Sequence, residues 1–140
     1  MVEPRHIDTT VFMRFFLKDD VERSQAALKL LQRIEMGEEV AFTTTVALFE
    51  VIYTLQKTAK YPKAMVRDAL TYVLGMPNLR IAEKTIFFMA LDLYVEKNIA
   101  FGDAYIAAVM RHQNIREVYS FDGHFDRIPD ITRIVPQSRD

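Results

Sequence analysis

Residues 6–16 read HIDTTVFMRFF, and they turn from a strand into a helix within a few positions. Residues 6–8 are expected to end a strand, and apolar residues from Val11 to Phe16 then recur at helical spacing. A strand that leads directly into a helix is typical of parallel α/β folds, in which helices connect neighbouring strands.

The rest of the chain repeats this alternation. Further strands are predicted at residues 40–44, 79–82, 118–121 and 132–135, and helices at 20–36, 45–55, 62–74, 83–97 and from Gly102 onward. Helices of this length between strands imply parallel crossovers. The predicted fold class is therefore α/β, a three-layer α/β/α sandwich with a mostly parallel central sheet of four to five strands. It forms a single domain over residues 1–136, with a polar tail at 137–140.

Composition limits the classes of function. The 140 residues are 50% apolar and 26% charged, they include no cysteine, and 18 Lys and Arg oppose 19 Asp and Glu for a formal charge of -1. This balance argues against nucleic-acid binding by bulk charge and against a polybasic membrane anchor. The longest apolar run, residues 104–110, is far shorter than the roughly 20 residues of a membrane span. Since the N-terminus also lacks the apolar core of a signal peptide, we expect a cytoplasmic protein without a membrane partner.

Four carboxylates stand at unusual positions in this pattern. Asp8 ends the first strand, Asp122 follows the fourth, and Asp103 comes at the start of a helix rich in small residues. Glu50 falls within residues 46–55, which are apolar nearly all round, so we expect it to be buried and either paired or bound to a metal. In parallel α/β folds, ligands bind outside the carboxyl ends of the strands.

Each carboxylate also has a purely structural explanation. Asp103 can serve as an N-cap or first-turn acid, and Asp8 can cap the helix that begins near Thr10. Asp122 can form an Asx-turn with Gly123, and Glu50 can form a buried salt bridge with an arginine. None of the four is decisive alone.

Their combination favours a metal site. Two carboxylates about 4 Å apart repel by roughly 4 kcal/mol at an effective dielectric constant of 20, which a fold tolerates when cations are normally bound. Oxygen ligands without cysteine select a hard ion such as Mg²⁺ or Mn²⁺ rather than zinc. Carboxylate-bound metals with open water positions are suited to phosphodiester hydrolysis.

Four segments together resemble the PIN domain, and their order and spacing are most similar to the single-domain VapC-type ribonuclease toxins. The segments are IDTTV at 7–11 with RF at 14–15, FEV at 49–51, FGDAYIAA at 101–108, and SFDGHFDRI at 120–128. The resemblance covers nearly the whole chain. It implies a metal-dependent ribonuclease that leaves a 5′-phosphate, a homodimer, and inhibition by a small cognate antitoxin.

The resemblance also implies roles for individual residues. Asp8, Glu50, Asp103 and Asp122 form an acidic quartet, in which the three aspartates bind Mg²⁺ (or Mn²⁺) and Glu50 orients a water or shares a second ion. Asp126 is implied as an auxiliary acid. Thr10 and Ser120, which stand where many members carry Asn and Thr, are expected to orient the carboxylates.

RNA must also be held through its phosphates, for which Arg14, Lys18 and Arg127 are the candidates. The three histidines are expected at surface or strand positions rather than as ligands, and His124 is the one in a loop near the predicted site. Without the acidic quartet, 18 basic residues face 15 acidic ones, so the near-neutral total conceals a negative pocket in a mildly basic surface.

Two alternatives stay open at this stage. PIN domains also serve in RNA processing outside toxin–antitoxin systems, and a related module can keep the fold as a regulatory or binding domain without the chemistry. The intact carboxylates favour an active enzyme over the inactive module, and the absence of fused domains favours the toxin.

Overall fold

The computed structural model describes residues 3–139, and the chain forms two compact units, of which the first ends at Lys84 and the second begins at Thr85. We call them the first and the second unit. Residues 1–2 of the predicted domain and residue 140 of the predicted tail lie outside the described residues.

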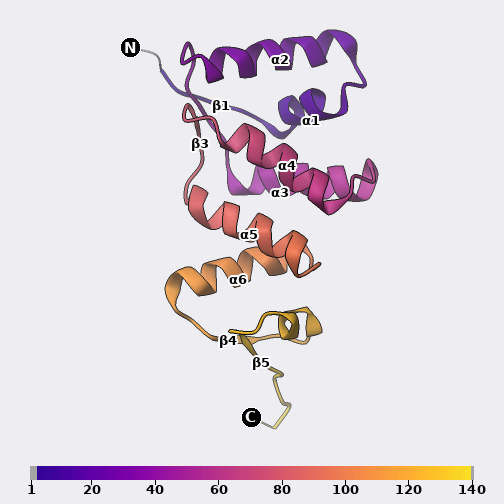
Figure 1. The fold of residues 1–140 in the computed structure, drawn as a ribbon, viewed down its shortest axis with the longest axis vertical. Coiled ribbons are helices and arrows are strands. Elements are labelled where there is room, and N and C mark those ends of the chain that lie inside the picture. The colour runs from indigo at the N-terminus through magenta and orange to yellow at the C-terminus, as the bar shows by residue number, and fades with distance from the viewer. Residues whose placement is uncertain (1–2, 140) are drawn as a thin grey trace. The chain divides into compact units, whose positions relative to one another are not determined.

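The described residues of the first unit form three strands and four α-helices, which can be followed in Figure 1. Its elements are β1 (Arg5–His6), α1 (Thr9–Leu17), α2 (Val21–Glu35), β2 (Ala41–Phe42), α3 (Thr45–Tyr53) with a π-helical continuation η1 (Thr54–Thr58), α4 (Lys63–Leu74) and β3 (Leu79–Arg80). Helix α2 is bounded as its sequence predicts, because Asp20 accepts a hydrogen bond from the backbone N–H of Arg23 at one end and Gly37 adopts φ +82° just beyond the other.

The three strands of this unit form one parallel sheet with β2 in the middle. Ile7 donates its backbone N–H to Phe42, and Thr43 donates its own to Arg80, so the ladder continues one residue past each strand. The hydroxyl of Thr43, which is 5% exposed, also donates to the carbonyl oxygen of Ile7 at 3.2 Å. Because this bond holds the residue before Asp8, it fixes where the chain leaves β1.

Apolar stripes on the helices form the core of the first unit. On α2, Ala27, Leu31 and Ile34 recur at spacings of four and three residues and are buried. On α3, Leu48 and Ile52 are buried in the same way, as are Phe12 on α1 and Leu70 on α4.

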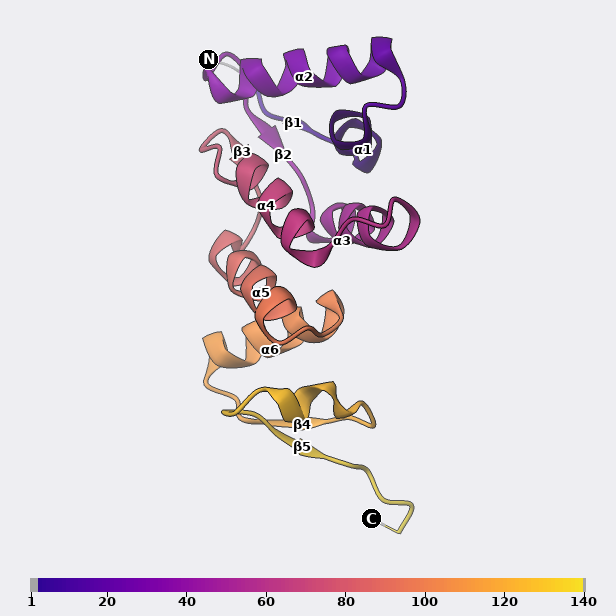
Figure 2. The same cartoon turned by 45° about the vertical axis from the view of Figure 1, so that its right-hand side comes forward.

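The second unit contains α5 (Lys84–Glu96, beginning at the last residue of the first unit), α6 (Phe101–Gln113), β4 (Glu117–Tyr119), a short 3₁₀ helix η2 (Gly123–Arg127) and β5 (Thr132–Ile134). Strands β4 and β5 pair in parallel, with Val118 opposite Arg133. Figure 2 shows η2 in the connection between the two strands, where it packs against β5.

Aromatic rings pack α5 against α6. Phe101 lies 5.2 Å from Phe87 and 5.6 Å from Tyr94, measured between ring centroids. Burial raises the pKa of the Tyr94 hydroxyl to about 12. The predicted small residues of α6, Ala104 and Ala107 among them, are fully buried and leave room for close packing.

The order and type of the predicted elements are confirmed within residues 3–139, with five strands, all paired in parallel. The strands are shorter than predicted, two or three residues each, because the parallel pairing covers only that many residues. Among the described residues, no helix is both long and apolar enough to cross a membrane. That residues 1–136 act as one domain stays a prediction.

Candidate functional site

Asp8 stands between β1 and α1, in extended conformation (φ −92°, ψ 158°) at the N-cap position of the helix. Its side chain accepts no capping hydrogen bond from the helix backbone, so the capping explanation is not realised. Instead, the Thr10 hydroxyl donates to Asp8 Oδ2 at 2.9 Å. Thr10 therefore orients the carboxylate of Asp8, which lies two residues before it in the sequence.

Glu50 is exposed, and the expectation that it is buried is wrong. Leu48 and Ile52 turn toward the core of the first unit, whereas Val46 and Tyr53, which share the side of Glu50, are 69% and 65% exposed. An apolar side chain is no proof of burial, because much of a protein surface is apolar.

Thr9 links the two acidic segments of the first unit. Its hydroxyl contacts both the carbonyl oxygen of Ala47 and Glu50 Oε2, each at 3.3 Å. Since Thr9 follows Asp8 directly, the residues around Asp8 and the middle of α3 lie side by side. Sequence reasoning missed Thr9, although its place after the strand-end aspartate is a usable signal.

Asp103, Asp122 and His124 form the acidic cluster of the second unit. The imidazole Nδ1 of His124 lies 3.4 Å from Asp103 Oδ2 and 3.3 Å from Asp122 Oδ1. One ligand atom from each residue lies within 4.8 Å of the others. Asp103 comes from the first turn of α6, and Asp122 precedes η2, where it accepts a hydrogen bond from the backbone N–H of His124 at 2.8 Å. The Asx-turn expected at Asp122 is thus present, and its carboxylate also faces Asp103.

The two carboxylates perturb one another. Burial raises the pKa of Asp103, and the neighbouring Asp122 raises it further, through a hydrogen bond and through its charge. The pKa of Asp122 is lowered, first by the backbone N–H of His124 and then by the hydrogen bond with Asp103. A proton therefore stays on Asp103 more readily than on an ordinary aspartate.

The donors of this cluster fit a divalent metal ion. Two carboxylates supply the oxygen ligands that Mg²⁺ and Mn²⁺ prefer, and the chain has no thiolate that would select zinc. The side chains are reachable from solvent, with exposed fractions of 20% for Asp103 and 43% for Asp122. Asp103 and Asp122 together with His124 can therefore hold one ion.

Ser120, expected to orient a carboxylate, and Asp126, expected as an auxiliary acid, each contact a different partner. The Ser120 hydroxyl accepts a hydrogen bond from the backbone N–H of Asp122 at 2.9 Å, so it shapes the turn rather than donating to the carboxylate. Asp126 forms two hydrogen bonds with the guanidinium of Arg133, at 3.1 and 3.0 Å, and these lower its pKa. Asp126 thus binds a cation that the protein itself supplies.

The predicted RNA-binding residues have different environments. Arg14 forms an ion pair with Asp19 at 2.9 Å, with about a third of its side chain exposed, and Lys18 is exposed in a left-handed conformation just past α1. Arg127 donates to the carbonyl oxygens of Lys97 and Asn98, at 3.4 and 2.6 Å, and so caps the end of α5. All three stay candidates for phosphate contacts, and Arg127 Nη1 also holds the end of α5.

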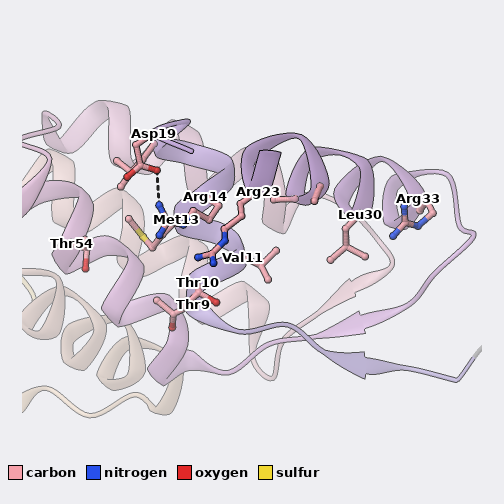
Figure 3. A pocket seen from close by; sticks show the side chains of 13 residues that line it. Thr9, Thr10, Val11, Met13, Arg14, Asp19, Arg23, Leu30, Arg33 and Thr54 are labelled. Carbon is pink, nitrogen blue, oxygen red and sulfur yellow. Dashed lines mark hydrogen bonds and ion pairs between the residues drawn. The ribbon is translucent and has the colours of Figure 1, made fainter. Parts of the chain in front are cut away.

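A cavity of about 730 Å³ lies in the first unit beside the Asp8 segment (Figure 3). Residues of α1 and α2 line most of it, and three of its basic side chains are Arg14, Arg23 and Arg33. Thr9 and Thr10 also line it, so it reaches the residues that contact Asp8 and Glu50. Sequence reasoning missed Arg23 and Arg33, which α2 brings to this cavity.

The chain matches the PIN domain over residues 6–131, and it belongs to the PIN domain family. No curated protein gives a significant match. Among solved structures, the chain is similar to Mycobacterium tuberculosis VapC20, which is described as a Sarcin-Ricin loop cleaving toxin. The identity is 20%, the match covers 96% of this chain and 100% of that chain, and the TM-score is 0.40.

The PIN-domain resemblance of the four segments is thereby confirmed, and with it the α/β fold class of that family. The matched range includes all four predicted acidic residues. The structure brings Asp103 and Asp122 together and joins the segments of Asp8 and Glu50 through Thr9. The roles of these residues are taken up as proposals below.

Proposed function

We propose that this PIN-domain protein is a divalent-metal-dependent endoribonuclease and the toxin of a toxin–antitoxin pair. The observation that carries the proposal is the cluster of Asp103, Asp122 and His124, a place for a cation in a chain of the PIN family. Family membership supports nuclease activity, and the order and spacing of the motifs, most similar to the VapC-type toxins, support the toxin role.

In this proposal, Asp8, Glu50, Asp103 and Asp122 all take part in the reaction. Thr10 orients the carboxylate of Asp8 through its 2.9 Å hydrogen bond. Glu50, exposed and held by Thr9, orients the attacking water. A bound Mg²⁺ or Mn²⁺ supplies Lewis acidity, which lowers the pKa of a coordinated water and offsets charge that develops on the phosphate.

Basic side chains around the acidic residues hold the phosphates of the RNA substrate. Arg14 and Lys18 contact phosphates near Asp8, and we add Arg23 and Arg33 because they line the same cavity as Thr9 and Thr10. Each of these arginines has a carboxylate partner on the surface, and a phosphate can replace such a partner at small cost because exposed ion pairs contribute about 0–1 kcal/mol.

The expected partners follow from the toxin role. A small antitoxin binds the chain and inhibits it. The protein is a homodimer, in which residues 1–136 of each chain form a single domain. It acts in the cytoplasm, where its RNA substrate is found. Sedimentation equilibrium of the purified protein tests the dimer. Co-purification with the short protein encoded beside it tests the antitoxin.

The experiment that tests the activity compares the natural protein with Asp8→Asn and Asp103→Asn, using total RNA and sequencing of the cut ends. Asp92→Asn is the matched control, because Asp92 is exposed on α5 and outside the proposed site. We expect cleavage that requires Mg²⁺ or Mn²⁺ and leaves 5′-phosphates. Both site variants should lose about a hundredfold or more, since the metal contributes several kcal/mol, whereas the control stays active.

Three results would separate the alternatives. Full activity of Asp8→Asn contradicts the site. Metal binding without cleavage of any RNA indicates an inactive binding module. Cleavage by the purified protein without growth arrest on expression indicates an RNA-processing nuclease rather than a toxin.

A further inference from the structure

His124 occupies the space between the two carboxylates of the second unit. Its Nδ1 is 3.4 Å from Asp103 Oδ2 and 3.3 Å from Asp122 Oδ1, so one ring nitrogen is nearly equidistant from both acids. The sequence alone favours a surface position for this residue, and its side chain is indeed 41% exposed. The partly exposed ring nevertheless contacts both acids.

The local fold holds the backbone of His124 beside Asp122. The backbone N–H of His124 donates to Asp122 Oδ1 at 2.8 Å at the start of η2, which ties the two residues into one turn. The next residue, Phe125, is 2% exposed, and Ile128 at the end of η2 is 1% exposed. Because these two apolar side chains anchor η2, the backbone of His124 is held in the turn from which its ring reaches Asp103.

The two distances from His124 Nδ1 to the carboxylate oxygens suit a shared ion. Two ligands bound at about 2.1 Å to one ion are about 3.0 Å apart at an angle of 90° and about 3.4 Å apart at the tetrahedral angle. The two separations from Nδ1 lie at the upper end of this range. The ring therefore stands where a third ligand would stand, without a change of backbone.

We propose that His124 Nδ1 is a ligand of the same ion that Asp103 and Asp122 bind, and that it makes the site prefer Mn²⁺ to Mg²⁺. This inference rests on the metal-dependent function proposed above and deepens it by naming the ion. Imidazole is a poor ligand for Mg²⁺, which prefers oxygen, and a better one for transition metals. The sequence-based expectation of an all-oxygen set, in which either ion serves, changes accordingly.

The test measures metal binding on the full-length protein without RNA. Pulsed electron paramagnetic resonance of the Mn²⁺-loaded protein detects the coupling of a directly bound ¹⁴N, and competition by Mg²⁺ gives the ratio of the two affinities. The variants are His124→Gln, which removes the nitrogen ligand, and His124→Asp, which replaces it with oxygen. His112→Gln on α6, where His112 is exposed, is the matched control.

We expect ¹⁴N coupling in the natural protein and in His112→Gln, and its loss in both His124 variants. The Mn²⁺ affinity of His124→Gln should fall about tenfold or more, since loss of even an indirect contact to a metal ligand costs 10–100-fold. His124→Asp should bind Mg²⁺ relatively better. Absence of ¹⁴N coupling in the natural protein, absence of Mn²⁺ binding, or an unchanged affinity ratio in His124→Gln overturns the inference.

These outcomes are distinct from a failure of the proposed function. Metal-dependent RNA cleavage without ¹⁴N coupling overturns the role of His124 and leaves the ribonuclease standing. Conversely, ¹⁴N coupling in a protein that cleaves no RNA supports the His124 ligand and contradicts the ribonuclease.

Discussion

Phe125 offers a sharp test of how the fold holds the acidic cluster. Its side chain is 2% exposed, and it lies directly after His124 in η2. Replacement by alanine removes most of a buried aromatic ring and leaves a cavity, at a cost of about 3–5 kcal/mol. In a domain of this size, each kcal/mol lowers Tm by roughly 3–4 °C, so the expected decrease is roughly 10–20 °C.

The comparison uses Phe121→Ala, because Phe121 is 77% exposed only four residues earlier in the same loop. This variant should lose less than about 0.5 kcal/mol, as is usual for surface substitutions. Thermal and urea unfolding give the stabilities, and Mn²⁺ titration at a temperature where both variants are folded gives the affinity. We expect weaker Mn²⁺ binding in Phe125→Ala alone. Equal stability losses in the two variants, or unchanged Mn²⁺ affinity in Phe125→Ala, would refute the idea that Phe125 anchors the cluster.

Three further predictions concern charge. Burial and a neighbouring carboxylate raise the pKa of Asp103, so the metal-free folded state loses stability as pH rises through that pKa, and Asp103→Asn should unfold at a higher temperature than the natural protein in EDTA at pH 7. The Arg111 guanidinium lowers the pKa of Asp130, and this exposed ion pair contributes below about 1 kcal/mol to the free energy of unfolding. The contribution should be present at pH 7 and vanish as pH falls through the lowered pKa of Asp130. The Tm values of the natural protein and of Asp130→Asn should therefore converge in acid. Finally, replacement of Arg23 and Arg33 by glutamine should weaken RNA binding in EDTA and reduce the slope of log K against log salt by about 1.4, and an unchanged slope would exclude them as phosphate contacts.

Local rules account for much of what the sequence predicted correctly. Asp20 and Gly37 mark the ends of α2 because capping and left-handed backbone depend only on neighbouring residues. The Asx-turn at Asp122 and the hydrogen bond from Thr10 to Asp8 each span two residues. Interactions of this range can be read along the chain.

The wrong expectation about Glu50 shows the limit of such rules. The residues around it are apolar on every side of α3, and the pattern does not say which side meets the core. In the structure, Leu48 and Ile52 are the buried ones, and Val46 and Tyr53 share the exposed side with Glu50. Burial depends on what stands opposite a helix, and this is a property of the packed chain.

The sequence by itself determined the type and order of the elements, the parallel α/β class, and four acidic residues within PIN-like segments, because periodicity, capping and motif spacing are local. Only the tertiary structure decided the partners of the charged groups. Asp126 pairs with Arg133, Arg127 binds the end of α5, and His124 faces Asp103. These contacts join residues from 7 to 29 positions apart, and their formation depends on how the elements pack in space.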